Sequence, residues 1–391
     1  MSDELPDGWA CADFFDFCVL QRGYDLPLAL VKSGPYPVMS SAGVVAHHAE
    51  FKARSPGVVT GRSGSIGRVF FVESDYWPHN TALFVKDFKG NDPKYVYFFL
   101  RGFDITKYSA STAVPTLNRN NLRDVTVNVP PLGEQRRIVA KLETVLGKVD
   151  ASQQRLAKIP VVLKRFRQSV LAAACSGCLT ADWREANPGV ETLNQTGHGQ
   201  TPDNFELPNS WGWLLSAHAF DFVTSGSRGW ARYYADDGPR FLRVGNLDHD
   251  SIQLDLRSIQ HVRPPDNAEG KRTRVQLGDL LVSVTADVGM VALVETDIGE
   301  AYINQHVALG RPNGNMDRRY LAYFLSAKNG GQHQFRNLQR GATKVGLGLE
   351  DIKNVWIARP PLPEQQEIVR RVEGLFALAD QLEMRLAPQQ A

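Results

Sequence analysis

The chain has 391 residues, of which 43% are hydrophobic and 22% are charged, and its formal net charge is only +2. This composition is typical of a protein with ordinary hydrophobic cores, and the length predicts more than one domain. The acidic start at residues 1–4 has no apolar core, so we expect no secretory signal. No apolar run approaches the roughly 20 residues that span a bilayer. The four cysteines are therefore expected to be thiols in a cytoplasmic protein.

The first part of the chain predicts an α+β domain with irregular strands and long loops. Short β-type runs at 58–59, 69–72 and 83–85 are separated by Gly, Pro and Asn. Similar runs return at 280–284 and 290–294. We therefore expect a first variable domain at 1–129, a helical region at 130–188, a second variable domain at 189–359 that begins with a linker at 189–200, and a short helical region at 360–391.

A long helix is predicted directly after Pro130-Pro131. Apolar residues follow in alternating steps of four and three, which indicates a helix packed along a seam against another helix. The residues expected to form this docking stripe are Ile138, Leu142, Val145, Val149, Leu156, Leu163 and Phe166. Pro160 lies inside the run and is expected to kink or break the helix. The alternative is an ordinary amphipathic surface helix, although such helices rarely keep a 4-3 stripe for so long.

The chain repeats itself. The block Pro-Pro-Leu-x-Glu-Gln at 130–135 returns at 360–365, an offset of 230 residues (360 − 130), and Ile-Val follows each copy at the same spacing. Leu5-Pro6-Asp7-Gly8-Trp9 is likewise matched by Leu207-Pro208-Asn209-Ser210-Trp211. The second copy also begins a heptad stripe, formed by Ile368, Val372, Leu375 and Leu382. The pattern predicts two copies of one module whose middles have diverged.

These residues resemble the specificity subunits of type I restriction-modification enzymes. The most specific feature is the Pro-Pro-Leu-x-Glu-Gln-x-x-Ile-Val block, which occurs twice at the head of a heptad helix. The first helix continues into Ser169–Thr180, which is similar to the family's small-residue ending with a Ser-Gly turn. Residues 36–43, 61–67, 226–228 and 241–247 also look like family segments.

The resemblance implies both a fold and a set of partners. It implies two target-recognition domains of irregular sheet plus helices, separated by long helices that pack as an antiparallel coiled coil with a pseudo-two-fold repeat. It further implies double-stranded DNA with a bipartite asymmetric target, two methyltransferase subunits clasped by the helices, and a motor-nuclease subunit that joins for cleavage. One departure is that the sequence stops 31 residues after Pro360 (391 − 360), so the counterpart of Leu163–Trp183 is missing.

Reading DNA requires cations that hold phosphates and polar side chains that contact base edges. In the first domain the candidates are Arg62, Ser63, Ser65 and Arg68, which alternate with glycines that allow close backbone approach, and Asn118 and Arg119. In the second domain they are Ser227, Arg228, Arg232, Arg243, Asn246 and Arg272. For each one taken alone, a solvated surface group is an equally good interpretation. The basic helical region at 130–171 favours docking of a partner over base reading.

The sequence predicts a chain that is not itself an enzyme. It lacks an Asn/Asp-Pro-Pro-Tyr motif, a glycine-rich nucleotide-binding turn after a strand, and a Gly-x4-Gly-Lys-Ser/Thr phosphate loop. Cys175-x-x-Cys178 is interpreted as a helix end with a turn at Gly177, so we expect neither a metal nor a cofactor. Two alternatives remain open at this point, a coiled-coil scaffold that reads no DNA and a self-contained DNA-modification enzyme.

Overall fold

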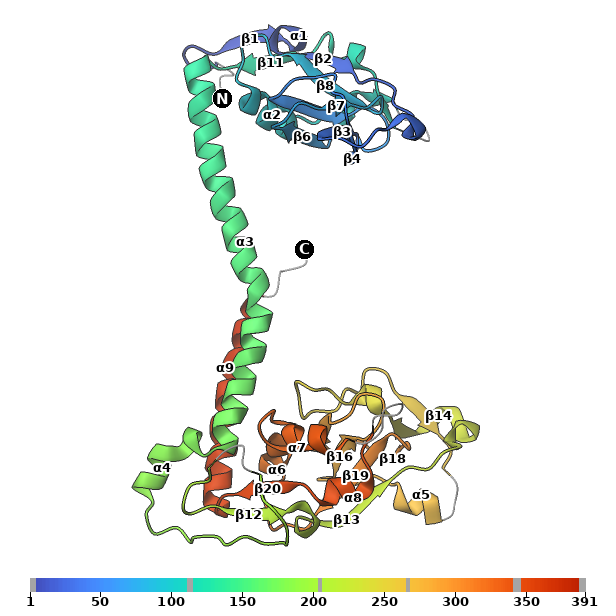
Figure 1. Cartoon of the computed structure of the whole chain (residues 1–391), viewed down its shortest axis with the longest axis vertical. Coiled ribbons are helices and arrows are strands. Elements are labelled where there is room, and N and C mark those ends of the chain that lie inside the picture. Colours follow the sequence, from blue (N-terminus) through green and yellow to red (C-terminus); the bar gives the residue numbers. More distant parts are fainter. Residues whose placement is uncertain (1–4, 111–114, 203–205, 265–267, 340–345, 387–391) are drawn as a thin grey trace. The chain divides into compact units, whose positions relative to one another are not determined.

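The computed structural model describes residues 5–110, 115–202, 206–264, 268–339 and 346–386. The chain divides into two compact units, Met1–Gln154 (unit 1) and Arg155–Ala391 (unit 2). Each unit is an α+β fold that contributes to or packs on a long helix (Figure 1). The α+β class predicted from the sequence is confirmed for both units.

Unit 1 is built around a four-stranded antiparallel sheet with the order β2-β8-β5-β6. A three-stranded sheet has the order β4-β3-β7, in which β3 and β7 are parallel, and β1 pairs with β11. The helices are α1 (Phe14–Phe17) and α2 (Pro93–Gly102). The strands are β1 (Ala10–Asp13), β2 (Val19–Arg22), β3 (Tyr36–Ser40), β4 (Gly43–His48), β5 (Gly57–Gly61), β6 (Val69–Val72), β7 (Trp77–Pro78), β8 (Ala82–Asp87), β9 (Ser109–Ala110), β10 (Thr116–Leu117) and β11 (Thr126–Val129).

Unit 2 has the same strand order. Its four-stranded sheet is β13-β19-β16-β17, its three-stranded sheet is β15-β14-β18 with β14 and β18 parallel, and β12 pairs with β20. The strands are β12 (Gly212–Leu215), β13 (Phe220–Ser225), β14 (Tyr234–Leu242), β15 (Gln260–Val262), β16 (Leu280–Ser283), β17 (Val291–Leu293), β18 (Ala301–Ile303), β19 (Val307–Pro312) and β20 (Trp356–Arg359). The helices are α4 (Ala181–Ala186), α5 (Ala268–Arg272), α6 (Arg318–Ser326), α7 (Gly331–Leu338), α8 (Leu349–Lys353) and α9 (Leu362–Leu386).

A buried glutamine fastens the long helix of unit 1 to its own domain. The Gln135 side chain is 2% exposed. Its Oε1 accepts from the Asp92 backbone N–H at 2.9 Å, and its Nε2 donates to the Pro130 carbonyl at 2.9 Å. Asp92 is the N-cap of α2, where its carboxylate accepts from two backbone N–H groups. The start of the long helix is therefore tied to the start of α2.

The same arrangement occurs in unit 2. Gln365 is 1% exposed, accepts from the Asp317 backbone N–H at 2.8 Å and donates to the Pro360 carbonyl at 2.7 Å. Asp317 caps α6 as Asp92 caps α2. The glutamine of the repeated Pro-Pro-Leu-x-Glu-Gln block thus has the same structural role in both copies.

The first long helix, α3, runs without interruption from Leu132 to Cys175. Pro160 does not break it, so the predicted break is wrong. A proline removes one backbone hydrogen bond, and the neighbouring bonds of a long helix can maintain the helical path. Gly177 follows the helix with a left-handed φ of 77°, as the predicted turn requires.

The segment at 189–200, predicted to be a linker, pairs part of its backbone with the residues at and just before β12. The backbone N–H of Thr196 donates to the Trp213 carbonyl at 2.7 Å, and the N–H of Leu215 donates to the Thr196 carbonyl at 2.8 Å. Leu193 also donates to the Ser210 carbonyl at 3.1 Å. Its polar composition suggested a linker, but its backbone groups pair along β12, which composition alone does not reveal.

Within unit 2, α9 packs antiparallel to the last part of α3. The Arg167 guanidinium contacts Asp380 at 2.6 Å and Glu383 at 2.9 Å near the end of α9. Thr180, which follows α3, instead reaches Glu364 at the start of α9. Leu171 and Ala174 of α3 share a hydrophobic core with buried residues of α9. The antiparallel pairing predicted for the helices is confirmed over this stretch.

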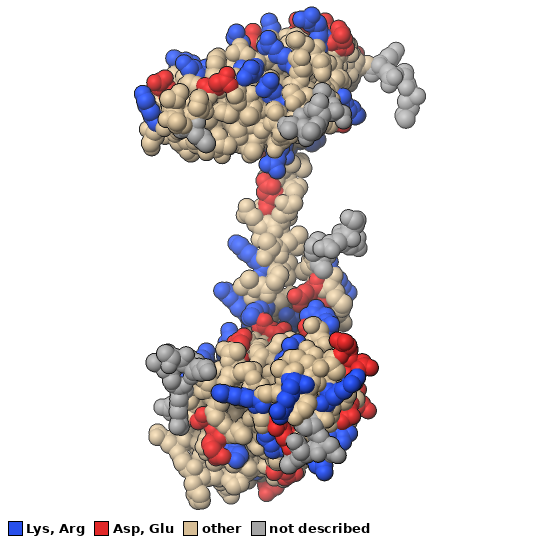
Figure 2. Space-filling model, turned by 90° about the vertical axis from the view of Figure 1, so that its right-hand side faces the viewer, with Lys and Arg blue, Asp and Glu red and all other residues tan. Residues whose placement is uncertain are grey.

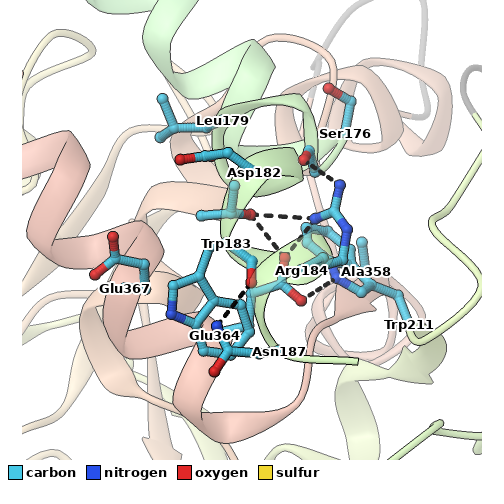
Figure 3. A network of polar contacts seen from close by, with 12 residues as sticks. Ser176, Leu179, Asp182, Trp183, Arg184, Asn187, Trp211, Ala358, Glu364 and Glu367 are labelled. Carbon is cyan, nitrogen blue, oxygen red and sulfur yellow. Dashed lines mark hydrogen bonds and ion pairs between the residues drawn. The ribbon is translucent and has the colours of Figure 1, made fainter. Parts of the chain in front are cut away.

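The carboxylate of Glu364 is the centre of a buried polar network (Figure 3). Glu364 is 0% exposed, and its oxygens accept from the Thr180 hydroxyl at 2.7 Å and from the Trp211 indole N–H at 2.8 Å. Arg184 forms an ion pair with it, and the same guanidinium lies over the Trp211 ring. In unit 1 the equivalent residue, Glu134, is 31% exposed and pairs with Arg137 of its own helix.

Because Glu364 is buried and Glu134 is partly exposed, we expect the same Glu→Gln substitution to lower stability more in unit 2 than in unit 1. Glu364→Gln removes the charge that compensates Arg184, so we expect unit 2 to lose about 2–3 kcal/mol of stability. Glu134→Gln, the matched control, should change stability by less than about 0.5 kcal/mol because its ion pair is exposed. Hydrogen exchange of peptides from each unit measures both effects, and equal losses would contradict the assignment.

Candidate nucleic-acid interface and helical docking surface

The turn between β5 and β6 brings Arg62, Ser63, Ser65 and Arg68 together. A Cβ atom at Gly61 would overlap the Ser65 carbonyl oxygen, so the turn requires glycine there. The Arg62 guanidinium donates to the Asn80 carbonyl at 3.1 Å, and Arg68 is exposed. The turn is therefore held rigidly while part of its polar surface faces solvent.

Asn118 and Arg119 lie next to this turn, because the N–H of Leu117 donates to the Arg62 carbonyl at 2.8 Å. The Asn118 side chain caps a short 3₁₀ turn by accepting from the Asn120 N–H at 3.0 Å. The Arg119 guanidinium donates to the Leu20 carbonyl at 3.1 Å. Both residues are exposed but already have a local structural role.

In unit 2, Arg272 organises the other candidates. Its guanidinium donates to the Ser225 carbonyl at 2.6 Å and to the Ser227 hydroxyl at 3.0 Å, and it also contacts the Thr224 hydroxyl. Arg272 therefore holds the end of β13 in place. Arg228 directly follows Ser227 in the chain. Its side chain is exposed and is therefore available to bind an anion.

Arg232 is exposed, and its guanidinium lies 4.8 Å from the centroid of the Tyr233 ring. On the face of unit 2 on which β14 and α5 lie in Figure 1, Figure 2 shows several Lys and Arg side chains near the centre, with Asp and Glu side chains around them. A cluster of this kind attracts phosphates even though the net charge of the chain is close to zero.

Asn246 has a different place from the one we expected. It is 3% exposed, accepts from the Arg243 N–H at 2.9 Å, and donates to the carbonyls of Asp255 and Ser258 at 2.8 and 3.0 Å. Its amide shapes the segment at 247–258, so we do not include Asn246 among the proposed base contacts. Arg243, three residues before it, is half-buried.

The predicted docking stripe divides into a buried and an exposed part. Leu163, Ile368 and Val372 are at most 7% exposed, and Ile138, Leu142 and Leu375 are half-buried. The remaining members are exposed, with Val145 at 49%, Val149 at 44%, Leu156 at 48%, Phe166 at 38% and Leu382 at 49%. Val161 and Val162, which lie off the predicted stripe, are 54% and 58% exposed. The chain therefore presents apolar helix surface in addition to the part that it buries.

Two searches of the described residues bear on other functions. Within the ranges that the structure describes, His, Cys, Asp and Glu side chains do not gather in groups of three or more that could hold a metal ion. In the same ranges, no helix combines the length and apolar character needed to cross a membrane.

A sequence model described as the type I restriction modification DNA specificity domain matches residues 6–161 and 267–387. The chain belongs to this family. The specificity subunit of the Escherichia coli type I enzyme EcoBI is 30% identical over 299 residues, which cover 75% of this chain and 60% of that protein. The EcoDI specificity subunit, also from Escherichia coli, is 24% identical over 404 residues, covering 98% and 84% of the two chains.

The chain spans about 60% of the length of several of these specificity subunits. Among solved structures, the HsdS subunit from Thermoanaerobacter tengcongensis superimposes with a TM-score of 0.61 at 19% identity, covering 99% of this chain and 93% of that one. At this identity the likeness supports the fold alone. The match to the family model and the identity to the EcoBI subunit confirm the resemblance to type I specificity subunits that the repeated block indicated.

Sequence reasoning missed the counterpart of the β5–β6 turn in unit 2, which is the turn between β16 and β17. Gly61, Gly64 and Gly67 correspond to Ser283, Ala286 and Gly289, an offset of 222 residues (283 − 61). The glycine pattern is therefore lost at two of three positions. The spacing of small residues could have revealed the match, but only after the offset within the divergent middle was known.

Proposed function

We propose that the chain is the DNA-reading subunit of a type I restriction-modification complex, in which each unit contacts one half of a split, asymmetric target. The observation that carries the proposal is that both units have one strand order but expose different side chains at equivalent places. A duplicated scaffold with two different surfaces suits a target with two different half-sites. Membership in the specificity family supports the same conclusion.

The proposed DNA contacts are of two kinds. Exposed cations such as Arg68, Arg228 and Arg232 would hold phosphates, which provides affinity with little sequence information. The side chains of the β5–β6 turn, Ser63 and Ser65 among them, would approach base edges. Arg272 acts indirectly in this account because its guanidinium is occupied in holding β13.

The long helix α3 would fix the spacer between the half-sites, and its exposed apolar surface would receive methyltransferase subunits. Val145, Val149 and Leu156 present about half of their surface to solvent on α3. Apolar surface of this kind on a charged helix is typical of a site that a partner covers. We propose that two methyltransferase subunits dock there, that a motor-nuclease subunit joins the complex for cleavage, and that the chain itself is non-catalytic and cytoplasmic.

Methylome sequencing of cells that produce the chain with its methyltransferase partner tests the function. We expect one bipartite motif with two different half-sites and a non-specific spacer. Inserting seven residues, about two helical turns, between residues 150 and 155 should change the spacer and leave both half-sites intact. A single contiguous motif would refute the bipartite proposal, and methyl transfer or cleavage by the purified chain alone would support the self-contained enzyme instead.

A charge placed on the exposed stripe tests the docking surface. Val149→Glu should leave folding unchanged because Val149 is 44% exposed. It should weaken capture of the methyltransferase subunit by more than about tenfold, because an unpaired charge would be buried in the interface. Gln154→Glu introduces the same charge about 140° further around the helix and is the matched control. Pull-down titration compares them, and equal capture by both variants would contradict docking at the stripe.

A further inference from the structure

The turn between β16 and β17 shares key backbone hydrogen bonds with the β5–β6 turn. The N–H of Arg62 donates to the Thr81 carbonyl at 2.9 Å, and the N–H of Val284 donates to the His306 carbonyl at 2.9 Å. In each unit a segment further along the chain also bonds to the turn. The backbone N–H of Leu117 donates to the Arg62 carbonyl, and the N–H of Leu347 donates to the Val284 carbonyl, both at 2.8 Å. Two turns with this many equivalent bonds have one architecture.

The shared architecture is kept in unit 2 at an energetic cost. Gly64 has a left-handed φ of 84°, which costs glycine little, whereas Ala286 at the same place has a φ of 66°. An alanine in this region is disfavoured by roughly 1 kcal/mol. Residues held in such conformations concentrate at functional sites. The conformation of the turn is thus conserved between the copies even where the residue type opposes it.

The side chains on the two turns differ in chemistry. The turn in unit 1 offers Arg62, Ser63 and Ser65, whereas the turn in unit 2 offers Thr285 and Asp287. Residues that maintain the fold, such as the pair Gln135 and Gln365, are instead identical and buried. The side chains on the two turns are half-buried or exposed. Accessible positions that differ on one common backbone are where a duplicated reader would distinguish its two half-sites.

Neighbouring histidines orient both polar side chains of the second turn. His249 Nε2 lies 2.8 Å from Asp287 Oδ1. The Thr285 hydroxyl contacts His306 Nδ1, and Gln305 lies 2.9 Å from the other ring nitrogen of His306. The buried Asn246 amide holds the segment that carries His249. Asn246 therefore supports the orientation of Asp287 indirectly, through His249.

We infer that the turn at 284–289 is a base-contacting element of unit 2, with Asp287 and Thr285 as its specificity-determining side chains and His249 and His306 as positioning residues. The inference rests on the proposed function and adds to it where one half-site is read. A carboxylate near DNA is repelled by phosphates, so it suits only a position where it accepts from a base amino group, above all cytosine N4. Threonine can contact the thymine methyl group through its own methyl.

The test uses the full chain bound to its methyltransferase partner and a random DNA library. Asp287→Asn is isosteric, and Asp287 is 65% exposed, so the variant should fold. An amide favours adenine where a carboxylate favours cytosine, so we expect one base of one half-site to change from cytosine toward adenine by about tenfold. Thr285→Ser keeps the hydroxyl and should lower the preference for thymine at a second position of that half-site.

Two control variants make the test specific. Ala286→Gly relieves the backbone strain without changing a polar side chain, so the selected motif should stay the same. Ser65→Ala, on the equivalent turn of unit 1, should alter only the other half-site. If the wild-type complex selects a bipartite motif but neither Asp287→Asn nor Thr285→Ser changes it, the inference about the turn is wrong and the proposed function stands. If the wild-type complex selects no bipartite motif, the proposed function itself fails.

Discussion

The side-chain amide of one buried glutamine in each copy determines how a long helix leaves its domain. An amide that is removed from water must have its donor and acceptor groups satisfied, or it costs several kcal/mol. Gln135 meets this requirement with Asp92 and Pro130, and Gln365 does so with Asp317 and Pro360. Because the bonded N–H groups belong to helix caps, the same contact sets the start of α2 or α6. The junction therefore fixes the start of the long helix relative to the helix that packs in the same unit.

The two copies are alike where the fold needs them to be and different where a ligand could be recognised. Strand order, helix caps and the glutamine contacts are shared. The equivalent turns after β5 and β16 are closed by equivalent backbone bonds at Arg62 and Val284, but one turn carries arginine and serine and the other carries threonine and aspartate. Glu364 adds a further difference, because it is buried among Thr180, Arg184 and Trp211 whereas Glu134 is partly exposed. This contrast is the basis of our proposal that the two related surfaces have separate specificities.

The sequence allowed prediction of features that depend on local periodicity or repetition. The heptad stripe predicted the long helix, and the repetition revealed the Pro-Pro-Leu-x-Glu-Gln block. The helix end at Gly177 was also predicted from local sequence. Features that depend on distant partners were not. The pairing of Thr196 with β12, the burial of Asn246 and the β16–β17 turn each rely on hydrogen bonds to residues that lie beyond the local turn or helix, where periodicity gives no signal. Glu134 and Glu364 occupy identical motifs, so their different burial could not be predicted from the motif itself.

The central claim is that each unit reads its own half of one target, and site-specific cross-linking tests it most directly. A photoreactive group is attached to a cysteine placed at Arg68 in unit 1 or at Arg228 in unit 2, both of which are exposed. The chain is bound with its methyltransferase partner to a DNA that contains the selected motif, and the cross-linked nucleotides are mapped. The account predicts that the two probes mark opposite half-sites of the same duplex. Cross-links from both probes to a single half-site would contradict it.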